Sequence, residues 1–438
     1  MKIPFFGQDE AGLFRHGTIM VVATFAGALL NAVFHMVIGR TLPNAEYGAL
    51  IAMHGLVLVT STPMLAMQNT LAHFTSKLLL AGRREEVRNL FWHWVNLFAV
   101  LSVVLMAGAW MGRASLGAFW GGLDSRLVVL TFVVLAASLW MYLFYGILQG
   151  VQSFHWLAWA PQAWGAARLV MGWVLTAVVS ATALAAMTAQ GIGVLTVLVL
   201  CSWAMARLRL PRAAAAVRRP SGTYRYLGSA LLCLGGYAML MNLDTTLARH
   251  YFDAETSGLF AKAATIARTA VFLPVPVAAA LFPKVTSSGA LSDQSWRLLV
   301  RALAFAGVLI VAVAAVCLAF PQLPWTVLYG PWSASHAALS AALVRAMVLA
   351  MSPLALAYLL LNFEMAQQRF RWGLGLVPCG LAYLGGVVLF HRHPLQIAGV
   401  LGVLNLIAVA LLLAGVMMRR LGSFRMRSGT DAVQSRPA

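Results

Sequence analysis

Four cationic side chains lie within long apolar stretches of this sequence, at Arg168, Lys262, Arg268 and Arg345. A charged side chain at membrane depth costs about 2.5–3.5 kcal/mol on insertion scales, so residues of this kind generally serve a functional path. Asp244 is the one acid that we assign to the same stretches. The surplus of positive charge favours binding of an anion. Arginine is suited to phosphate, because its planar guanidinium donates two parallel hydrogen bonds.

The depth of each charge follows from its place in its apolar stretch, at about 1.5 Å of rise per helical residue. This count puts Arg168, Arg268 and Arg345 near the middle of a membrane. Lys262 lies nearer one end and level with Asp244, so we expect these two to form an ion pair. Each cation could instead bond helix carbonyls, or extend along its stem to water. Asp244 has a second possible role, as a site where an ion or a proton couples to transport.

Several other polar residues in these stretches can form hydrogen bonds. Asn242, Thr245 and Arg249 follow helical spacing and therefore share one face of a helix. The candidates for contact with a bound ligand are Asn31, Gln68, Asn69, Asn242 and Arg249. Each could equally make a contact between helices.

No pattern in the sequence indicates catalysis, a cofactor or a metal site. The 4 cysteines stand singly in apolar segments without CxxC spacing. There is no phosphate-binding glycine loop and no HExxH. We therefore expect a protein that is not an enzyme and that has no cofactor and no metal.

The composition is that of a membrane protein. Of the 438 residues, 61% are hydrophobic and 10% are charged, whereas soluble domains have about 25% charged residues. The fold class expected is all-α and polytopic, with about twelve transmembrane helices of about 20 residues or more. The predicted ranges are 12–39, 46–78, 89–112, 126–149, 156–182, 188–208, 224–253, 256–283, 297–320, 335–364, 370–391 and 394–419.

Positive charge is distributed unevenly between the two sides of these predicted helices. The net charge is +19, and most Lys and Arg residues outside the helices fall on the side that includes both termini. The opposite side has only Arg40, Arg113, Arg126, Arg249 and Arg392. This bias places both termini in the cytoplasm. The basic surface then faces anionic lipid headgroups, and we expect no binding of nucleic acid.

The longest polar gap, Arg207–Arg225, divides the chain near its middle. We predict an N-terminal six-helix lobe over 1–208 and a basic cytoplasmic connector over 209–223. A C-terminal six-helix lobe over 224–420 follows, with a disordered cytoplasmic tail over 421–438.

The two lobes begin with similar sequences. In each, an asparagine (Asn31 or Asn242) precedes a short polar link that contains an acid, and a glycine (Gly48 or Gly258) follows the link. Proline then interrupts the second helix, once in the first lobe and twice, at 274 and 276, in the second. The similarity indicates an internal duplication, as in many transporters, with the ligand site between the repeats.

These features resemble one branch of a known superfamily. The residues that carry the resemblance are Gly39–Arg40, the segment Glu46–Gly48 and Pro63 in the first lobe, and Asp244, Ser257–Ala264 and Arg268 in the second. They look like the polysaccharide-exporter branch of the multidrug/oligosaccharidyl-lipid/polysaccharide (MOP) flippase superfamily. The resemblance covers about residues 12–420 and implies two lobes in the V-shaped arrangement of MATE proteins.

The resemblance also implies a function. A flippase of this kind moves polyprenyl-diphosphate-linked oligosaccharide by alternating access, from the cytoplasmic to the outer leaflet of a bacterial inner membrane. Its partners would be this lipid-linked cargo, membrane lipid and polysaccharide assembly enzymes. On this view Arg268, Arg345, Arg168 and Lys262 contact the diphosphate. One alternative is a multidrug or small-organic-ion antiporter of the same fold. Another is a membrane scaffold for glycan assembly that transports nothing.

Overall fold

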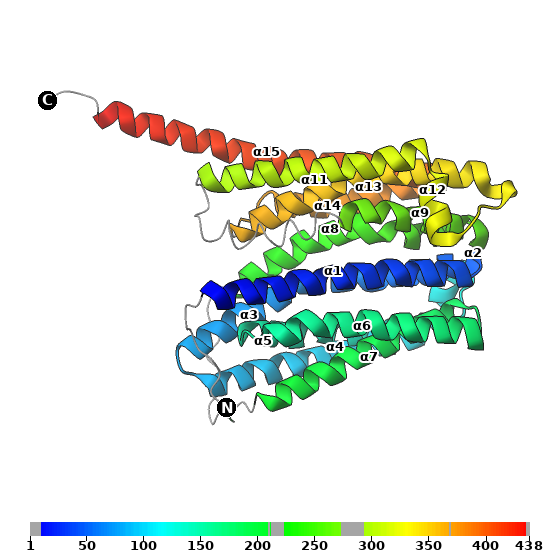
Figure 1. Ribbon diagram of the computed structural model, residues 1–438, viewed down its shortest axis with the longest axis horizontal. Helices are drawn as coiled ribbons and strands as arrows, with labels where there is room; N and C mark the ends of the chain where they lie inside the picture. Colours follow the sequence, from blue (N-terminus) through cyan, green and yellow to red (C-terminus); the bar gives the residue numbers. More distant parts are fainter. Residues whose placement is uncertain (1–9, 209–210, 212–222, 273–292, 368, 435–438) are drawn as a thin grey trace. The chain divides into compact units, whose positions relative to one another are not determined.

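The computed structural model describes residues 10–208, 211, 223–272, 293–367 and 369–434, and these residues form helices with no strand. The chain divides into two units (Figure 1), of which the first comprises Met1–Val57 and Met64–Thr223, and the second Leu58–Pro63 and Tyr224–Ala438. Prolines 274 and 276 and nearly all of the predicted connector lie outside the described residues.

The described part of the first unit has seven α-helices, of which α2 ends in the segment Leu58–Pro63 that belongs to the second unit. They are α1 (Glu10–Thr41), α2 (Asn44–Ser61), α3 (Met64–Leu80), α4 (Arg84–Phe119), α5 (Ser125–Gly150), α6 (Phe154–Val174) and α7 (Ala183–Arg207). A π-helical turn, Leu175–Val179, continues α6. The predicted helix over 46–78 is divided into α2 and α3 by a turn at residues 62 and 63. Pro63 lies in this turn and has no amide hydrogen to continue the helical ladder.

The second unit contains the remaining helices. They are α8 (Thr223–Tyr251), α9 (Ala254–Phe272), α11 (Asp293–Ala319), α12 (Gln322–Tyr329), α13 (Ala337–Ala366), α14 (Leu376–Leu389) and α15 (Pro394–Gln434). The sequence did not predict α12. The predicted disordered tail begins as a continuation of α15, which extends beyond the predicted end at 419.

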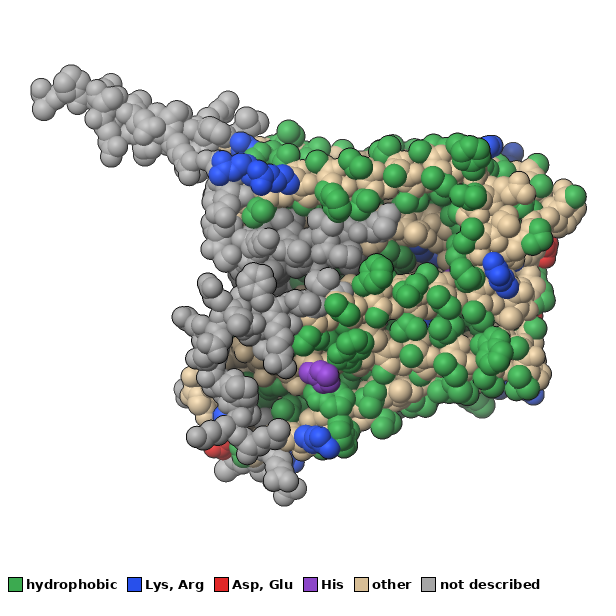
Figure 2. All heavy atoms as spheres, viewed as in Figure 1, with side chains coloured by type: hydrophobic (Ala, Val, Ile, Leu, Met, Phe, Trp, Pro, Cys, Tyr) green, Lys and Arg blue, Asp and Glu red, His purple; other side chains and the backbone are tan. Residues whose placement is uncertain are grey.

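The expected fold class is confirmed. Ten helical segments of the described chain are long and apolar enough to cross a membrane, counting Asn44–Leu80 as one. The two other predicted spans correspond to α9, described as far as Phe272, and to the shorter apolar segment Gly373–Leu389. Figure 2 shows hydrophobic side chains along the visible flanks of the helices, with Lys and Arg side chains mainly near their ends.

Both units repeat one packing pattern. In the first unit α3, α4 and α7 each pack against α5, and α6 packs against α7. In the second unit α9, α11 and α15 each pack against α13, and α14 packs against α15. Each unit is therefore built around one central helix, α5 or α13. This repetition supports the internal duplication inferred from the sequence.

We use "outer end" for the end of each unit where α1, α4, α11 and α14 terminate, following the predicted topology. At this end Glu46, in the first turn of α2, accepts a hydrogen bond at 2.7 Å from the amide of Ala183, the first residue of α7. The Thr182 hydroxyl accepts a second, from Ala185. Acceptors at a helix N-terminus satisfy amides that have no intrahelical partner. This explains why α7 begins earlier than the predicted start at residue 188.

Candidate functional site

Arg268 and Asp244 form one ion pair between α9 and α8. The Arg268 guanidinium donates through an Nη to Oδ1 of Asp244 and through Nε to the Met241 carbonyl at 3.2 Å. The Asp244 side chain is fully buried and that of Arg268 is 9% exposed. Such a pair is favourable only with good hydrogen-bond geometry, because both charges lose their hydration. The structure thus brings these two predicted site residues together.

The predicted partner of Asp244 was Lys262, and here the structure corrects the prediction. Lys262 and Arg268 are six residues apart on α9, which turns them about 240° from one another at 100° per residue. Depth alone suggested Lys262, but the direction around the helix axis favours Arg268.

Lys262 lies instead beside the aromatic face of α12. Its ammonium nitrogen is 5.2 Å from the ring centre of Tyr329 and 5.9 Å from that of Trp325. A cation over an aromatic face is attracted by the ring quadrupole. The Tyr329 hydroxyl also donates to the Lys262 carbonyl at 3.3 Å. These contacts hold α12 against α9 at the outer end.

Buried oxygen atoms near the ion pair retain unused hydrogen-bonding capacity. Within the described residues Oδ2 of Asp244, Oδ1 of Asn242 and the Tyr383 hydroxyl have no partner. Tyr383 lies close enough to Asp244 and Arg268 to interact with both electrostatically. The amide nitrogen of Asn242 donates to the Ala238 carbonyl of its own helix at 3.2 Å. The region around Asp244 can therefore accept a proton or bind a small polar group.

Arg168 lies at the centre of a separate cluster in the first unit and is fully buried. It donates to Oδ1 of Asn31 on α1 and, at 3.3 Å, to Oε1 of Gln190 on α7. Its guanidinium carbon also lies 4.3 Å from the ring centre of Phe34 and 3.9 Å from that of Trp164. Through these contacts Arg168 on α6 connects α1 and α7. The side chain of Asn31, a predicted ligand contact, is used in this contact between helices.

Arg345 is exposed, in contrast to the other three predicted cations. Its Nε donates at 3.0 Å to the carbonyl of Leu318, in the last turn of α11. A cation is favourable there because the last carbonyls of a helix lack intrahelical partners and carry negative partial charge. Arg345 thus donates a hydrogen bond to α11, whereas Arg268 donates hydrogen bonds to α8.

The remaining polar candidates are distributed over both units. Gln68 donates to Gln149 at 2.9 Å, between α3 and α5. Asn69, next to it, is half-buried. Arg249 was assigned to the outer side from the sequence, but it is 7% exposed and donates to Ser257 of α9 at 3.2 Å.

Glu364 is a second buried acid, which was not predicted because it lies at the predicted end of its helix. Glu364 is 1% exposed and accepts a hydrogen bond from Arg419 of α15 at 2.5 Å. Two features of the sequence could have predicted this pair. Glu364 is a lone acid at the end of one predicted span, and Arg419 and Arg420 are a basic pair at the end of another.

Charge in the interior is nevertheless predominantly positive. Among the described residues the buried cations are Arg168, Arg249, Lys262 and Arg268, and the buried acids are Asp244 and Glu364. No cluster of three or more potential His, Cys, Asp or Glu metal ligands occurs in this part of the chain.

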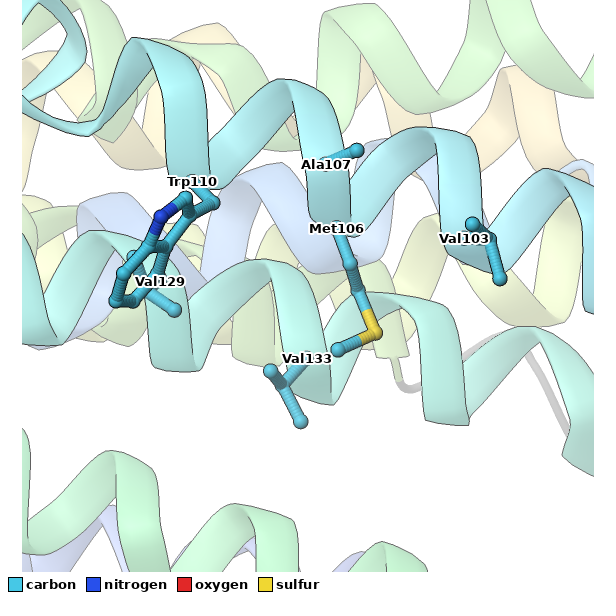
Figure 3. Close-up of a pocket in the computed structure, with 6 residues that line it drawn as sticks. All are labelled: Val103, Met106, Ala107, Trp110, Val129 and Val133. Carbon is cyan, nitrogen blue, oxygen red and sulfur yellow. The ribbon is translucent and has the colours of Figure 1, made fainter.

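A pocket on the first unit has the wrong chemistry for an anionic ligand. It has a volume of about 400 Å³ and lies between α4 and α5 (Figure 3), where Met106 and Trp110 approach Val129 and Val133. All six of its lining residues, which also include Val103 and Ala107, are apolar or aromatic. The pocket therefore suits lipid chains.

Several solved structures have a similar fold. An inward-facing multidrug resistance MATE family transporter of the MOP superfamily aligns with a TM-score of 0.73 and 12% identity, covering 93% of this chain and 98% of the other. Lipid II flippase MurJ, in an inward closed conformation, aligns with a TM-score of 0.70 and 12% identity, covering 96% and 94%. The predicted resemblance is confirmed at the level of the fold.

A third similar structure is a MOP superfamily transporter from Pyrococcus furiosus. It aligns with a TM-score of 0.66 and 14% identity, covering 92% of this chain and 95% of the other. Its binding pocket is described as having reverse polarity, which suggests a different function for that protein. In sequence searches, no protein-family model and no curated protein matches the chain.

Proposed function

Because the chain has the fold of MOP superfamily transporters, we propose that it is a flippase for an anionic lipid-linked glycan. The proposed cargo is a polyprenyl-diphosphate-linked oligosaccharide, moved by alternating access from the cytoplasmic to the outer leaflet of an inner membrane. Both termini are cytoplasmic in this proposal. The cargo, membrane lipid and enzymes of polysaccharide assembly are its partners.

The observation that carries this proposal is the excess of buried positive charge. Four cations, Arg168, Arg249, Lys262 and Arg268, and two acids, Asp244 and Glu364, are buried among the described residues. Glu364 is paired with Arg419 and Asp244 with Arg268, and Glu255 lies near enough to Lys262 to attract it. Charges in a region of low dielectric interact strongly and need compensation. A diphosphate supplies the missing negative charge, whereas a cationic drug would add to the excess.

Arg268 is the residue that we assign to the diphosphate. Its Nε and one Nη are used by Met241 and Asp244, and its second Nη has no partner among the described residues. An incoming diphosphate could bind that nitrogen and compete with Asp244 for the other. Lys262, on the same helix, faces α12 rather than Asp244, so its contact with the diphosphate stays a prediction from the sequence.

Asp244 has two possible roles in such a cycle. It can neutralise Arg268 while the site holds no cargo, or it can take up a proton or an ion that drives transport. The unpartnered Oδ2 of Asp244 and the hydroxyl of Tyr383 favour the second role. Dependence of the flipping rate on a proton or sodium gradient, lost in Asp244→Asn, would distinguish coupling from neutralisation.

The multidrug antiporter is the alternative, and the MATE transporters of similar structure support it. The Pyrococcus furiosus protein shows why fold cannot decide between the two cargoes, since its pocket polarity suggested a different function on the same fold. The charge of the interior is therefore the property that an experiment must test.

The test is transport by purified protein in liposomes, with labelled polyprenyl-diphosphate sugar and, separately, a cationic dye. Arg268→Ala leaves Asp244 unpaired, so the informative variant is Arg268→Gln/Asp244→Asn, which removes both charges. We expect a loss of about 10- to 100-fold in flipping rate, the equivalent of one or two charge-assisted hydrogen bonds.

Arg113→Gln is the matched control and should leave the rate unchanged, because Arg113 is a half-buried arginine near the outer end of α4 that contacts Trp110 of its own helix. Normal flipping by the folded double variant would reject the role of Arg268. Transport of the dye but not of the glycan lipid would establish the antiporter, and transport of neither would favour a scaffold.

A further inference from the structure

A pocket of about 940 Å³ lies at the outer end of the second unit, among the end of α11, α12 and the start of α13. The helix α12 has one buried face and one face that lines the pocket. Trp325 and Tyr329 are buried beside Lys262, whereas Leu323 and Val327 line the pocket and are 57% and 53% exposed. All of the residues that line the pocket belong to the second unit.

Arg345 is not among the residues that line this pocket, but its neighbours on α13 and α11 are. Ala341, one turn before Arg345 on α13, lines the pocket. Ala319 also lines it, and the residue before Ala319 is Leu318, whose carbonyl accepts the hydrogen bond from Arg345. Helical side chains lean toward the N-terminus of their helix, and the N-terminus of α13 is at the outer end. The guanidinium therefore points toward the pocket. Its two Nη groups have no partner among the described residues.

The pocket has donors and no acid. The Trp332 indole N–H is buried and has no acceptor within the described residues. Trp332 lines the pocket, as do Gln322 and Thr326, whose side chains can also donate. No Asp or Glu is among its lining residues. This set of groups is complementary to an anion.

The position of the pocket indicates that the anion is part of a lipid. Arg345 lies eight residues into α13, about 12 Å from its outer end at 1.5 Å per residue. The side chain then reaches back to the last turn of α11, so the guanidinium lies nearer the outer end than the mid-membrane depth predicted from the sequence. The exposed apolar side chains of Phe320, Leu323 and Val327 provide a surface for acyl chains.

We propose that this pocket binds an anionic phospholipid of the outer leaflet. The phosphate accepts hydrogen bonds from Arg345 and Trp332, and an acyl chain packs against α12 and the end of α11. Arginine suits this role because its fork matches phosphate oxygens. The site is separate from the Arg268–Asp244 pair and does not depend on the identity of the transported cargo.

The site can be tested by adding phosphatidylglycerol or phosphatidylcholine to the purified protein in detergent. The apparent Tm is measured at each lipid concentration, and the number of retained lipids is measured by native mass spectrometry. Phosphatidylglycerol should stabilise the wild type more than phosphatidylcholine does. Arg345→Gln should weaken its apparent affinity by about tenfold, the effect of losing a charge-assisted bond, and should retain one lipid fewer. Arg392→Gln, an exposed arginine at the same end, is the matched control and should behave as wild type.

Arg345→Gln also removes the hydrogen bond from Arg345 to the last turn of α11. A second variant therefore keeps Arg345 and its charge. Ala341→Leu places a bulkier side chain on the α13 wall of the pocket, one turn from Arg345, and should weaken the phosphatidylglycerol effect although Arg345 remains. Full stabilisation by phosphatidylglycerol in Ala341→Leu, or in a folded Arg345→Gln, would overturn the proposal. Equal stabilisation by water-soluble glycerol phosphate would also overturn it, since it would show that no lipid chain is needed.

Discussion

The Asp244–Arg268 pair illustrates how strongly a single residue depends on its partner inside a membrane protein. Asp244 is fully buried and Arg268 nearly so, so neither charge can be hydrated when the other is removed. Removing one member of a buried pair typically costs about 3–5 kcal/mol, whereas replacing both by neutral groups is often nearly neutral. The pair can therefore be tested by a double-mutant cycle.

We expect Asp244→Asn and Arg268→Gln each to lower the apparent Tm, and the double variant to recover most of the loss. The physical reason is that each single change leaves one uncompensated charge, and the double change leaves none. Thermal unfolding in detergent measures all four proteins. Additive losses in the double variant would show that the two side chains do not act as a pair.

At this scale the charged residues could be predicted from the sequence, but their contacts could not. Asp244, Lys262 and Arg268 were predicted at membrane depth because charges within apolar stretches are conspicuous. The predicted partner of Asp244 was Lys262, since depth is a linear count along a helix. Which side of α9 faces α8 depends on packing, which a single sequence does not record.

At the scale of the element, helix ends depend on contacts with distant segments. The start of α7 is satisfied by Glu46, which is more than one hundred residues away along the chain. Neither that contact nor the eight-residue α12 has a periodic signature in the sequence. The long apolar helices were predicted well because their length and composition alone require them.

The start of α9 is a helix end whose stabilisation can be measured. Oδ1 of Asp253 accepts hydrogen bonds from the amides of Glu255, at 3.0 Å, and Thr256, at 2.9 Å. Asp253→Ala should destabilise the protein by about 1 kcal/mol, the usual value for an N-cap. Asp253→Asn, which keeps an acceptor oxygen, is the matched control and should lose much less.

The contribution of Asp253 should also depend on pH. The Thr256 hydroxyl and amide, together with the Glu255 amide, hold the pKa of the Asp253 carboxyl below its usual value. A lowered pKa means that the ionised form stabilises the fold above the unfolded pKa of about 3.9. That stabilisation disappears as the pH falls through the lower, folded value. The difference in apparent Tm between Asp253→Ala and wild type should thus shrink below about pH 4, and a constant difference down to pH 2 would contradict the assignment.

At the scale of the whole molecule, the duplicated packing and the charge bias make one joint prediction about topology. Both units place a central helix, α5 or α13, among three others, and a duplication of six spans would give both units the same orientation. That requires α9 to belong to a complete crossing. The 19 residues of α9 extend about 28 Å, close to the roughly 30 Å of hydrocarbon.

Single cysteines at Ala81 and Ser333 test this prediction. Ala81 follows α3 on the basic side, Ser333 precedes α13 at the outer end, and both are exposed. The 4 native cysteines are buried and should react little. In sealed right-side-out vesicles a membrane-impermeant maleimide should label Ser333→Cys directly, but Ala81→Cys only after permeabilisation. Labelling of both from one side would mean an even number of crossings between them, so that α9 does not complete a span. The reverse pattern would place both termini outside, against the bias in Lys and Arg.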